Sequence, residues 1–123
     1  MELGYREGSI FVECRHGVWV LSLRGEHDLS TQPSLSEEID RVAAAGGPVI
    51  IDLTDADFID SSILRVLAGA AVEGSEGPRV AVVIPPGREA MRILRVTGIA
   101  SLLQPYDTCE AAMASFAPAA TGG

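Results

Sequence analysis

Hydrophobic positions follow two different periods along this chain, and the change of period predicts its elements. Residues 9–15 alternate apolar and polar side chains, and residues 18–24 form a second strand-like run. The pair His16–Gly17 between them predicts a tight hairpin turn. Residues 49–53 and 79–84 are almost entirely apolar, as expected for strands covered on both faces. The pattern therefore predicts an antiparallel hairpin followed by buried central strands.

Apolar residues recur at helical spacing in four other segments. The first helix is predicted over residues 30–45, where a Gly-Gly-Pro sequence ends it. The second helix begins after Asp60, and the third ends at Gly98. The last helix is predicted to be capped by Asp107, with Glu110 at the capping-box position.

The order of these segments predicts the fold class. Residues 102–106 read as a short final strand, so the expected order is β-β-α-β-α-β-α-β-α. Alternating strands and helices imply right-handed crossovers and a mostly parallel centre. We expect an α/β fold with a mixed sheet of about five strands, about four to five helices and an antiparallel N-terminal hairpin. Residues 1–117 are expected to form one domain and residues 118–123 a disordered tail.

Composition narrows the classes of function. Hydrophobic residues make up 47% of the 123 residues, which suits one compact domain with a sizeable core. The net charge of −8, with no basic cluster, disfavours binding to nucleic acid. No apolar run reaches the length of a membrane span and no secretory signal is visible, so a cytoplasmic location is expected. Cys14 and Cys109 are then expected to be reduced thiols in or near the core.

Several kinds of catalytic site lack the residues they need. The sequence contains no lysine, which excludes a Walker-A lysine, a Schiff-base lysine and a kinase-type catalytic lysine. No glycine-rich phosphate loop follows a strand, and no G-x-S-x-G sequence is present. Two histidines and two distant cysteines do not form a recognisable zinc site. These absences leave few enzymatic options, and we expect no bound metal or cofactor.

Two hydroxyl groups stand at the predicted start of the second helix, in the sequence Asp60-Ser61-Ser62. The first N–H groups of a helix have no intrahelical partner, and the helix dipole is positive there. A phosphoryl group attached to one of these serines would be well accommodated. The plainer interpretation is that Asp60 or Ser61 is only an N-cap, and these three residues by themselves favour it.

Two further clusters could carry chemistry, and a structural interpretation is preferred for each. Acidic residues crowd the carboxyl end of the third predicted strand, namely Asp52, Asp55, Asp57 and Asp60. A magnesium or phosphoacceptor site as in a receiver domain would also need a lysine, so a solvated acidic turn is favoured. A basic stripe lies on the third predicted helix, namely Arg88, Arg92 and Arg95. A solvated helix face explains it better than an anion or partner site.

A second loop, GEHDLST at residues 25–31, joins the second strand to the first helix. Simple N-capping by Ser30 or Thr31 would explain it. If the second and third strands are neighbours in the sheet, this loop lies beside Asp60, and Asp28 faces the same surface.

With these segments placed, the chain resembles the STAS domain, which is named for sulfate transporters and anti-sigma-factor antagonists. The resemblance covers about residues 9–116 and is carried by three stretches: GEHDLST at 25–31, VIIDLTDADFIDSS at 49–62 and RILRVTGI at 92–99. At this length the chain is similar to the stand-alone anti-sigma factor antagonists, also called anti-anti-sigma factors.

The resemblance implies a partner-switching cycle in bacterial transcription regulation and stress response. The unmodified protein would bind an anti-sigma factor that is also a serine kinase, which frees the sigma factor. The kinase would phosphorylate the first serine after the aspartate, Ser61, with Ser62 as the alternative acceptor, and a phosphoserine phosphatase would reset the cycle. The family often has glycine where this chain has Ile63 and Arg65, a departure that bears on the choice of partner.

The two loops are expected to form one partner-binding rim, because both leave strands and enter helices. The expected contact residues are Asp28, Ser30, Thr31, Phe58, Ile59, Asp60, Ser61, Ser62, Ile63, Leu64 and Arg65. One alternative is a STAS protein of a transport or ligand-sensing complex that is not phosphorylated on serine. A small nucleotide-binding or hydrolysing protein is disfavoured by the missing phosphate loop. The sequence leaves the oligomeric state open.

Overall fold

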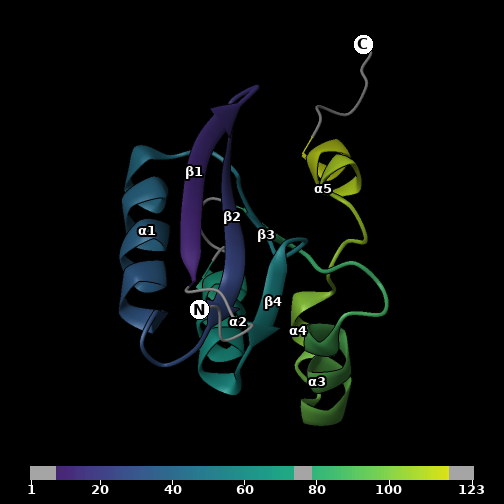
Figure 1. The fold of residues 1–123 in the computed structure, drawn as a ribbon. Coiled ribbons are helices and arrows are strands. Elements are labelled where there is room, and N and C mark those ends of the chain that lie inside the picture. The colour runs from purple at the N-terminus through teal and green to yellow at the C-terminus, as the bar shows by residue number, and fades with distance from the viewer. Residues whose placement is uncertain (1–7, 74–78, 117–123) are drawn as a thin grey trace.

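A mixed five-stranded sheet forms the centre of the molecule (Figure 1). The computed structural model describes residues 8–73 and 79–116. The strands are β1 (Ser9–Arg15), β2 (Val18–His27), β3 (Val49–Asp52), β4 (Ala56–Ile59) and β5 (Val80–Val83). β1 pairs antiparallel with β2, and the order β2-β3-β5 continues with parallel pairs. The predicted α/β fold with its antiparallel N-terminal hairpin is confirmed.

Among the described residues, five helices cover the two faces of the sheet unequally. They are α1 (Gln32–Ala45), α2 (Ser61–Glu73), α3 (Glu89–Thr97), α4 (Ala100–Leu103) and α5 (Cys109–Ser115). Buried residues of α1 to α4 belong to one apolar cluster, and α5 contributes to a second cluster on the other face. Figure 1 shows α1 and α5 on opposite sides of the sheet. Within the described residues, no helix is long and apolar enough to cross a membrane.

The strands alternate their side chains between these two clusters. Leu21 and Ile51 belong to the larger cluster, whereas Val20 and Ile50 belong to the cluster beneath α5. All four side chains are fully buried. Because both faces of β2 and β3 are covered, their sequences read as nearly continuous apolar runs. Burying one such side chain contributes about 1.5–3 kcal/mol to folding.

The predicted hairpin turn between β1 and β2 is confirmed. His16 and Gly17 both have positive φ, at 52° and 80°. Positive φ at both central residues is the type I′ geometry that matches the twist of paired strands. The predicted end of α3 is also confirmed, because Gly98 adopts a left-handed conformation with φ 79°.

The acidic turn after β3 contains a strand that the sequence does not predict. β4 pairs in parallel with the last residues of β2, where the register shifts between Gly25 and Glu26. β2 therefore continues to His27 instead of ending at Gly25. Ala56 and Ile59 are the buried residues of β4. This spacing of three does not show the alternation from which a strand is recognised.

Three sequence-based element predictions are wrong. Residues 102–106 do not form a strand: α4 ends at Leu103, and Tyr106 makes one isolated bridge to Val83. The cap of α5 is Thr108, whose hydroxyl oxygen accepts the N–H of Ala111 at 3.1 Å. The first helix begins at Gln32 and not at residue 30, because residues 28–30 form a separate turn.

The two cysteines are free thiols in different surroundings. Cys14 is exposed, which corrects the expectation of a core position. It lies near the end of β1, an edge strand that is mostly exposed. Cys109 is partly buried, and this burial raises the pKa of its thiol.

Candidate functional site

The two loops that the sequence analysis selects as candidates, at residues 25–31 and around Asp60, lie side by side. β2 is paired with both β3 and β4, so the ends of these strands reach the same edge of the sheet. The backbone N–H of Asp60 donates to the carbonyl of His27 at 3.2 Å. Residues 28–31 and 60–62 therefore form one rim, as expected for loops that leave neighbouring parallel strands.

Asp60 caps α2 through its side chain. One carboxylate oxygen, Oδ1, accepts the backbone N–H groups of Ser62 at 3.0 Å and Ile63 at 3.2 Å. These N–H groups belong to the first turn and have no acceptor inside the helix. The predicted capping role of Asp60 is confirmed.

The two candidate serines differ in what their hydroxyl groups do. The Ser62 hydroxyl donates to Asp60 Oδ1 at 2.6 Å, and its side chain is half-buried. Ser61 is exposed. Its hydroxyl makes no hydrogen bond to any residue that the structure describes. The cap therefore engages one hydroxyl and leaves the other open to solvent.

Asp28 shapes the neighbouring loop by the same local motif. Its Oδ1 accepts the backbone N–H of Ser30 at 2.9 Å and the Ser30 hydroxyl at 2.6 Å. The bond from the hydroxyl is the larger cause, and together the two bonds hold the pKa of Asp28 below its ordinary value. Asp28 and Ser30 are exposed, so a carboxylate that stays ionised lies on the rim.

His27 is a structural residue of the rim that the sequence analysis missed. Its side chain is only 1% exposed. Nε2 lies 3.1 Å from the carbonyl oxygens of Ser9 and Arg24, so this nitrogen carries the hydrogen and donates. Nδ1 lies 3.1 Å from the Thr31 hydroxyl. His27 thus joins β1, β2 and the start of α1, and the alternation through Leu21 and Leu23 could have indicated its buried position.

Three of the expected contact residues do not lie on the rim surface. Ile59, Ile63 and Leu64 are buried in the larger core cluster, with exposed fractions of 2%, 0% and 0%. The inner faces of β4 and α2 require these side chains for packing. They cannot offer them to a partner, which corrects this part of the prediction. Ile63 also presents no side chain that could obstruct docking.

The remaining expected contact residues are at least partly accessible. Asp28, Ser30, Ser61 and Arg65 are exposed, while Thr31, Asp60 and Ser62 are half-buried. Phe58 is 42% exposed, so part of its apolar side chain is accessible at the rim. The accessible rim is therefore defined by Asp28, Ser30, Thr31, Phe58, Asp60, Ser61, Ser62 and Arg65.

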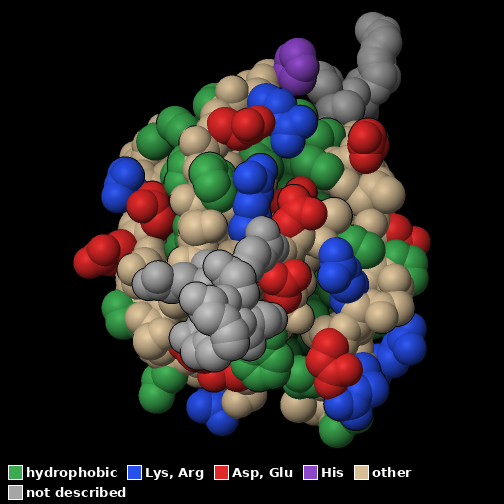
Figure 2. All heavy atoms as spheres, viewed as in Figure 1, with side chains coloured by type: hydrophobic (Ala, Val, Ile, Leu, Met, Phe, Trp, Pro, Cys, Tyr) green, Lys and Arg blue, Asp and Glu red, His purple; other side chains and the backbone are tan. Residues whose placement is uncertain are grey.

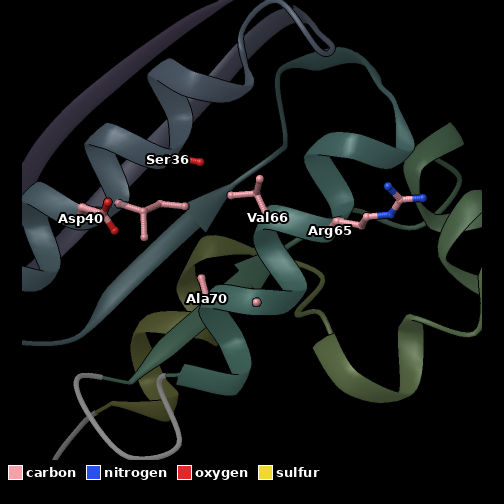
Figure 3. Close-up of a pocket in the computed structure, with 7 residues that line it drawn as sticks. Ser36, Asp40, Arg65, Val66 and Ala70 are labelled. Carbon is pink, nitrogen blue, oxygen red and sulfur yellow. The ribbon is translucent and has the colours of Figure 1, made fainter.

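A groove between α1 and α2 continues this rim. It has a volume of about 280 Å³ and is lined by Ser36, Ile39, Asp40, Arg65, Val66, Gly69 and Ala70. Figure 3 shows the Arg65 side chain pointing away from α1 and from Asp40. Within residues 8–73 and 79–116, neither of these two charged side chains forms an ion pair.

Residues of the acidic turn and of the arginine stripe contact each other and their neighbours. Asp52 accepts the N–H and the hydroxyl of Thr54, and Arg88 donates to the Thr54 carbonyl. Arg92 pairs with Glu89 on its own helix. Acidic and basic side chains are interspersed over the face in Figure 2. Among the described residues, no group of three or more histidine, cysteine or acidic side chains could hold a metal ion.

Comparisons with known proteins give one consistent result. The STAS domain family model matches residues 9–112. The anti-sigma-F factor antagonist RsfB of Mycobacterium tuberculosis is 29% identical over 106 residues, which covers 85% of this chain and 86% of RsfB. A crystal structure of an anti-sigma factor antagonist from Mycobacterium paratuberculosis superposes with a TM-score of 0.80 at 29% identity, covering 89% of this chain and 94% of the other.

A more distant solved structure has the same fold. The anti-sigma factor antagonist SpoIIAA in its unphosphorylated form superposes with a TM-score of 0.69 at 19% identity. The match covers 87% of this chain and 95% of SpoIIAA. At this identity the likeness concerns the fold alone.

Proposed function

The chain belongs to the STAS domain family, and we propose that it is an anti-sigma factor antagonist that is switched off by phosphorylation of Ser61. The similar proteins named above support the first part. The observation that supports the second is the exposed Ser61 hydroxyl, which has no hydrogen bond to a described residue, beside the bonded hydroxyl of Ser62. The protein acts by binding and is not an enzyme.

In the proposed cycle, the unmodified rim binds an anti-sigma factor with serine kinase activity in the cytoplasm. The kinase transfers the γ-phosphoryl group of ATP to Ser61 Oγ, and ADP leaves. The complex then dissociates, and a phosphoserine phosphatase hydrolyses the phosphate to restore the binding form. Transcription that depends on the released sigma factor therefore increases with the fraction of the protein that is unmodified.

The electrostatics of the rim suit such a switch. Phosphate adds a charge of about −1.5 to −2 at neutral pH, next to Asp60 and near Asp28 in a chain whose net charge is already −8. The added charge acts over a Debye length of about 8–10 Å, which spans a contact centred on this rim. The start of α2 tolerates the phosphate because the helix dipole there favours negative charge. The change therefore affects partner binding far more than folding.

The test is a kinase reaction with the purified anti-sigma factor of the same organism and ATP. Wild-type protein and Ser62→Ala should each gain one phosphate, and Ser61→Ala should gain none, as read by intact mass and peptide mapping. A phosphate found on Ser62 alone would contradict the choice of Ser61. Binding of the anti-sigma factor without phosphate on any variant would contradict the phosphorylation of Ser61 and leave the antagonist role standing. The absence of both binding and phosphate would support the alternative of a STAS protein of a transport or ligand-sensing complex.

A further inference from the structure

Arg65 follows Ser61 by one helical turn on the exposed side of α2. Both residues are exposed, and residues four apart in a helix have Cβ atoms about 5–6 Å from each other. Helical side chains lean toward the N-terminus of their helix, so Arg65 leans toward the turn that holds Ser61. A negative group on Ser61 would stand N-terminal to the cation, which is the favourable order for such a pair.

Most arginines that the structure describes already have a partner. Ion pairs, hydrogen bonds or ring contacts involve Arg15, Arg24, Arg41, Arg79, Arg88 and Arg92. Arg65 and Arg95 have none among the described residues. Their guanidinium groups are therefore available to a new anion.

The helix dipole distinguishes these two unpaired arginines. Arg95 lies in the last turn of α3, where the dipole favours a cation. Arg65 lies near the start of α2, where the dipole favours an anion. Its side chain also points away from Asp40, the acidic residue of the adjoining groove (Figure 3). The Arg65 cation is therefore held neither by the helix dipole nor by an ion pair to a described residue.

We propose that Arg65 binds the phosphate group of phosphorylated Ser61 within α2. This inference rests on the proposed function and specifies how the modified site is arranged. The planar guanidinium can donate two parallel N–H groups to two phosphate oxygens, in a rigid fork that the ammonium group of lysine does not have. Phosphorylation would then change the rim twice, because it adds negative charge and also withdraws the Arg65 cation from the surface offered to a partner.

The test uses protein in which phosphoserine is encoded directly at position 61, so that no kinase is required. Phosphorus NMR gives the second pKa of the phosphate in this protein and in its Arg65→Gln and Arg95→Gln variants. The guanidinium favours the dianion, so the phosphate pKa should be lower by roughly half a unit when Arg65 is present. Arg95→Gln is the matched control, because Arg95 is also exposed and unpaired, and it should leave this pKa unchanged.

A second readout needs no substitution. The Nε–H resonance of Arg65 should shift between the unmodified and the phosphorylated protein, while that of Arg95 should stay in place. Equal phosphate pKa values in all three proteins, or an unchanged Arg65 resonance, would overturn the inference. Such a result would not affect the kinase reaction, which decides independently whether Ser61 is the acceptor.

Discussion

The carboxylate of Asp60 holds the first turn of α2 through two backbone N–H groups. Asp60→Ala should lower the free energy of unfolding by about 1 kcal/mol, because those N–H groups lose their acceptor. Urea denaturation followed by circular dichroism measures this loss. Asp40→Ala is the control, since Asp40 is exposed on α1 and has no ion pair among the described residues. Equal losses in the two variants would contradict a capping role for Asp60.

The Ser30 hydroxyl and N–H stabilise the ionised form of Asp28. Ser30→Ala should raise the pKa of Asp28 toward its ordinary value, because the hydroxyl bond is lost. Because the folded-state pKa lies below the unfolded one, this contribution is present above the unfolded pKa and is lost as pH falls through the folded pKa. NMR titration of the Asp28 carboxyl measures the shift, with Ser34→Ala on the exposed side of α1 as the control. An unmoved Asp28 pKa would contradict this explanation.

Single residues of the site were predictable where their role is local. The sequence indicated Asp60 as a cap because an aspartate before a helical pattern has a restricted set of uses. The choice of Ser61 over Ser62 came from the family resemblance and not from local physics, since their difference depends on which hydroxyl donates to the Asp60 side chain. The role of His27 could not be predicted either, because two of its hydrogen bonds reach carbonyls that the strand register places beside it.

Replacing a glycine by alanine within α2 or just before β1 should change the free energy of unfolding, in opposite directions at the two positions. Gly69 lies inside α2, and a Cβ there would meet nothing within 4 Å. Gly69→Ala should therefore raise the free energy of unfolding by up to about 1 kcal/mol, through helix propensity. A Cβ at Gly8 would lie 2.2 Å from the Glu26 carbonyl oxygen and 3.0 Å from the His27 ring, so Gly8→Ala should destabilise. Thermal unfolding of both variants measures these two changes in stability. A stabilising effect of Gly8→Ala would contradict the close packing of residue 8.

The exposed side of α2 should also be the side that the partner contacts. Arg65→Glu places a negative charge one turn from Ser61 and should weaken binding of the anti-sigma factor without changing the circular dichroism spectrum. Arg95→Glu on α3 is the matched control and should have a smaller effect. Calorimetric titration of the anti-sigma factor with each variant shows which substitution weakens binding more. A larger loss for Arg95→Glu would move the interface to α3.

The elements that the sequence predicted well are those with a long and regular pattern. β3 and β5 could be recognised as apolar runs, and α1 to α3 as apolar residues at helical spacing between glycine signals. β4 was missed because it is short and pairs through an irregular register. The strand expected at 102–106 failed because a short apolar run does not distinguish strand from helix, and Leu102–Leu103 belong to α4.

Across the whole molecule, the residues that form the packed core lie apart from the residues of the rim. The two core clusters lie on the two faces of the sheet, while the rim stands at the end of β2 and β4. A change at Ser61 therefore alters charge at the surface and leaves the packed interior as it is. The sequence indicated this arrangement through the expected pairing of the second and third strands, which the structure has, although residues 60–62 directly follow β4, which also pairs with β2.

In the proposed cycle, one phosphate on Ser61 decides whether the partner binds. Isothermal titration calorimetry should compare the anti-sigma factor of the same organism with the unmodified protein and with protein carrying encoded phosphoserine at position 61. The Kd of the phosphorylated form should be at least about tenfold higher, which corresponds to about 1.4 kcal/mol of lost binding free energy. Equal affinities of the two forms, with both correctly folded by circular dichroism, would contradict it.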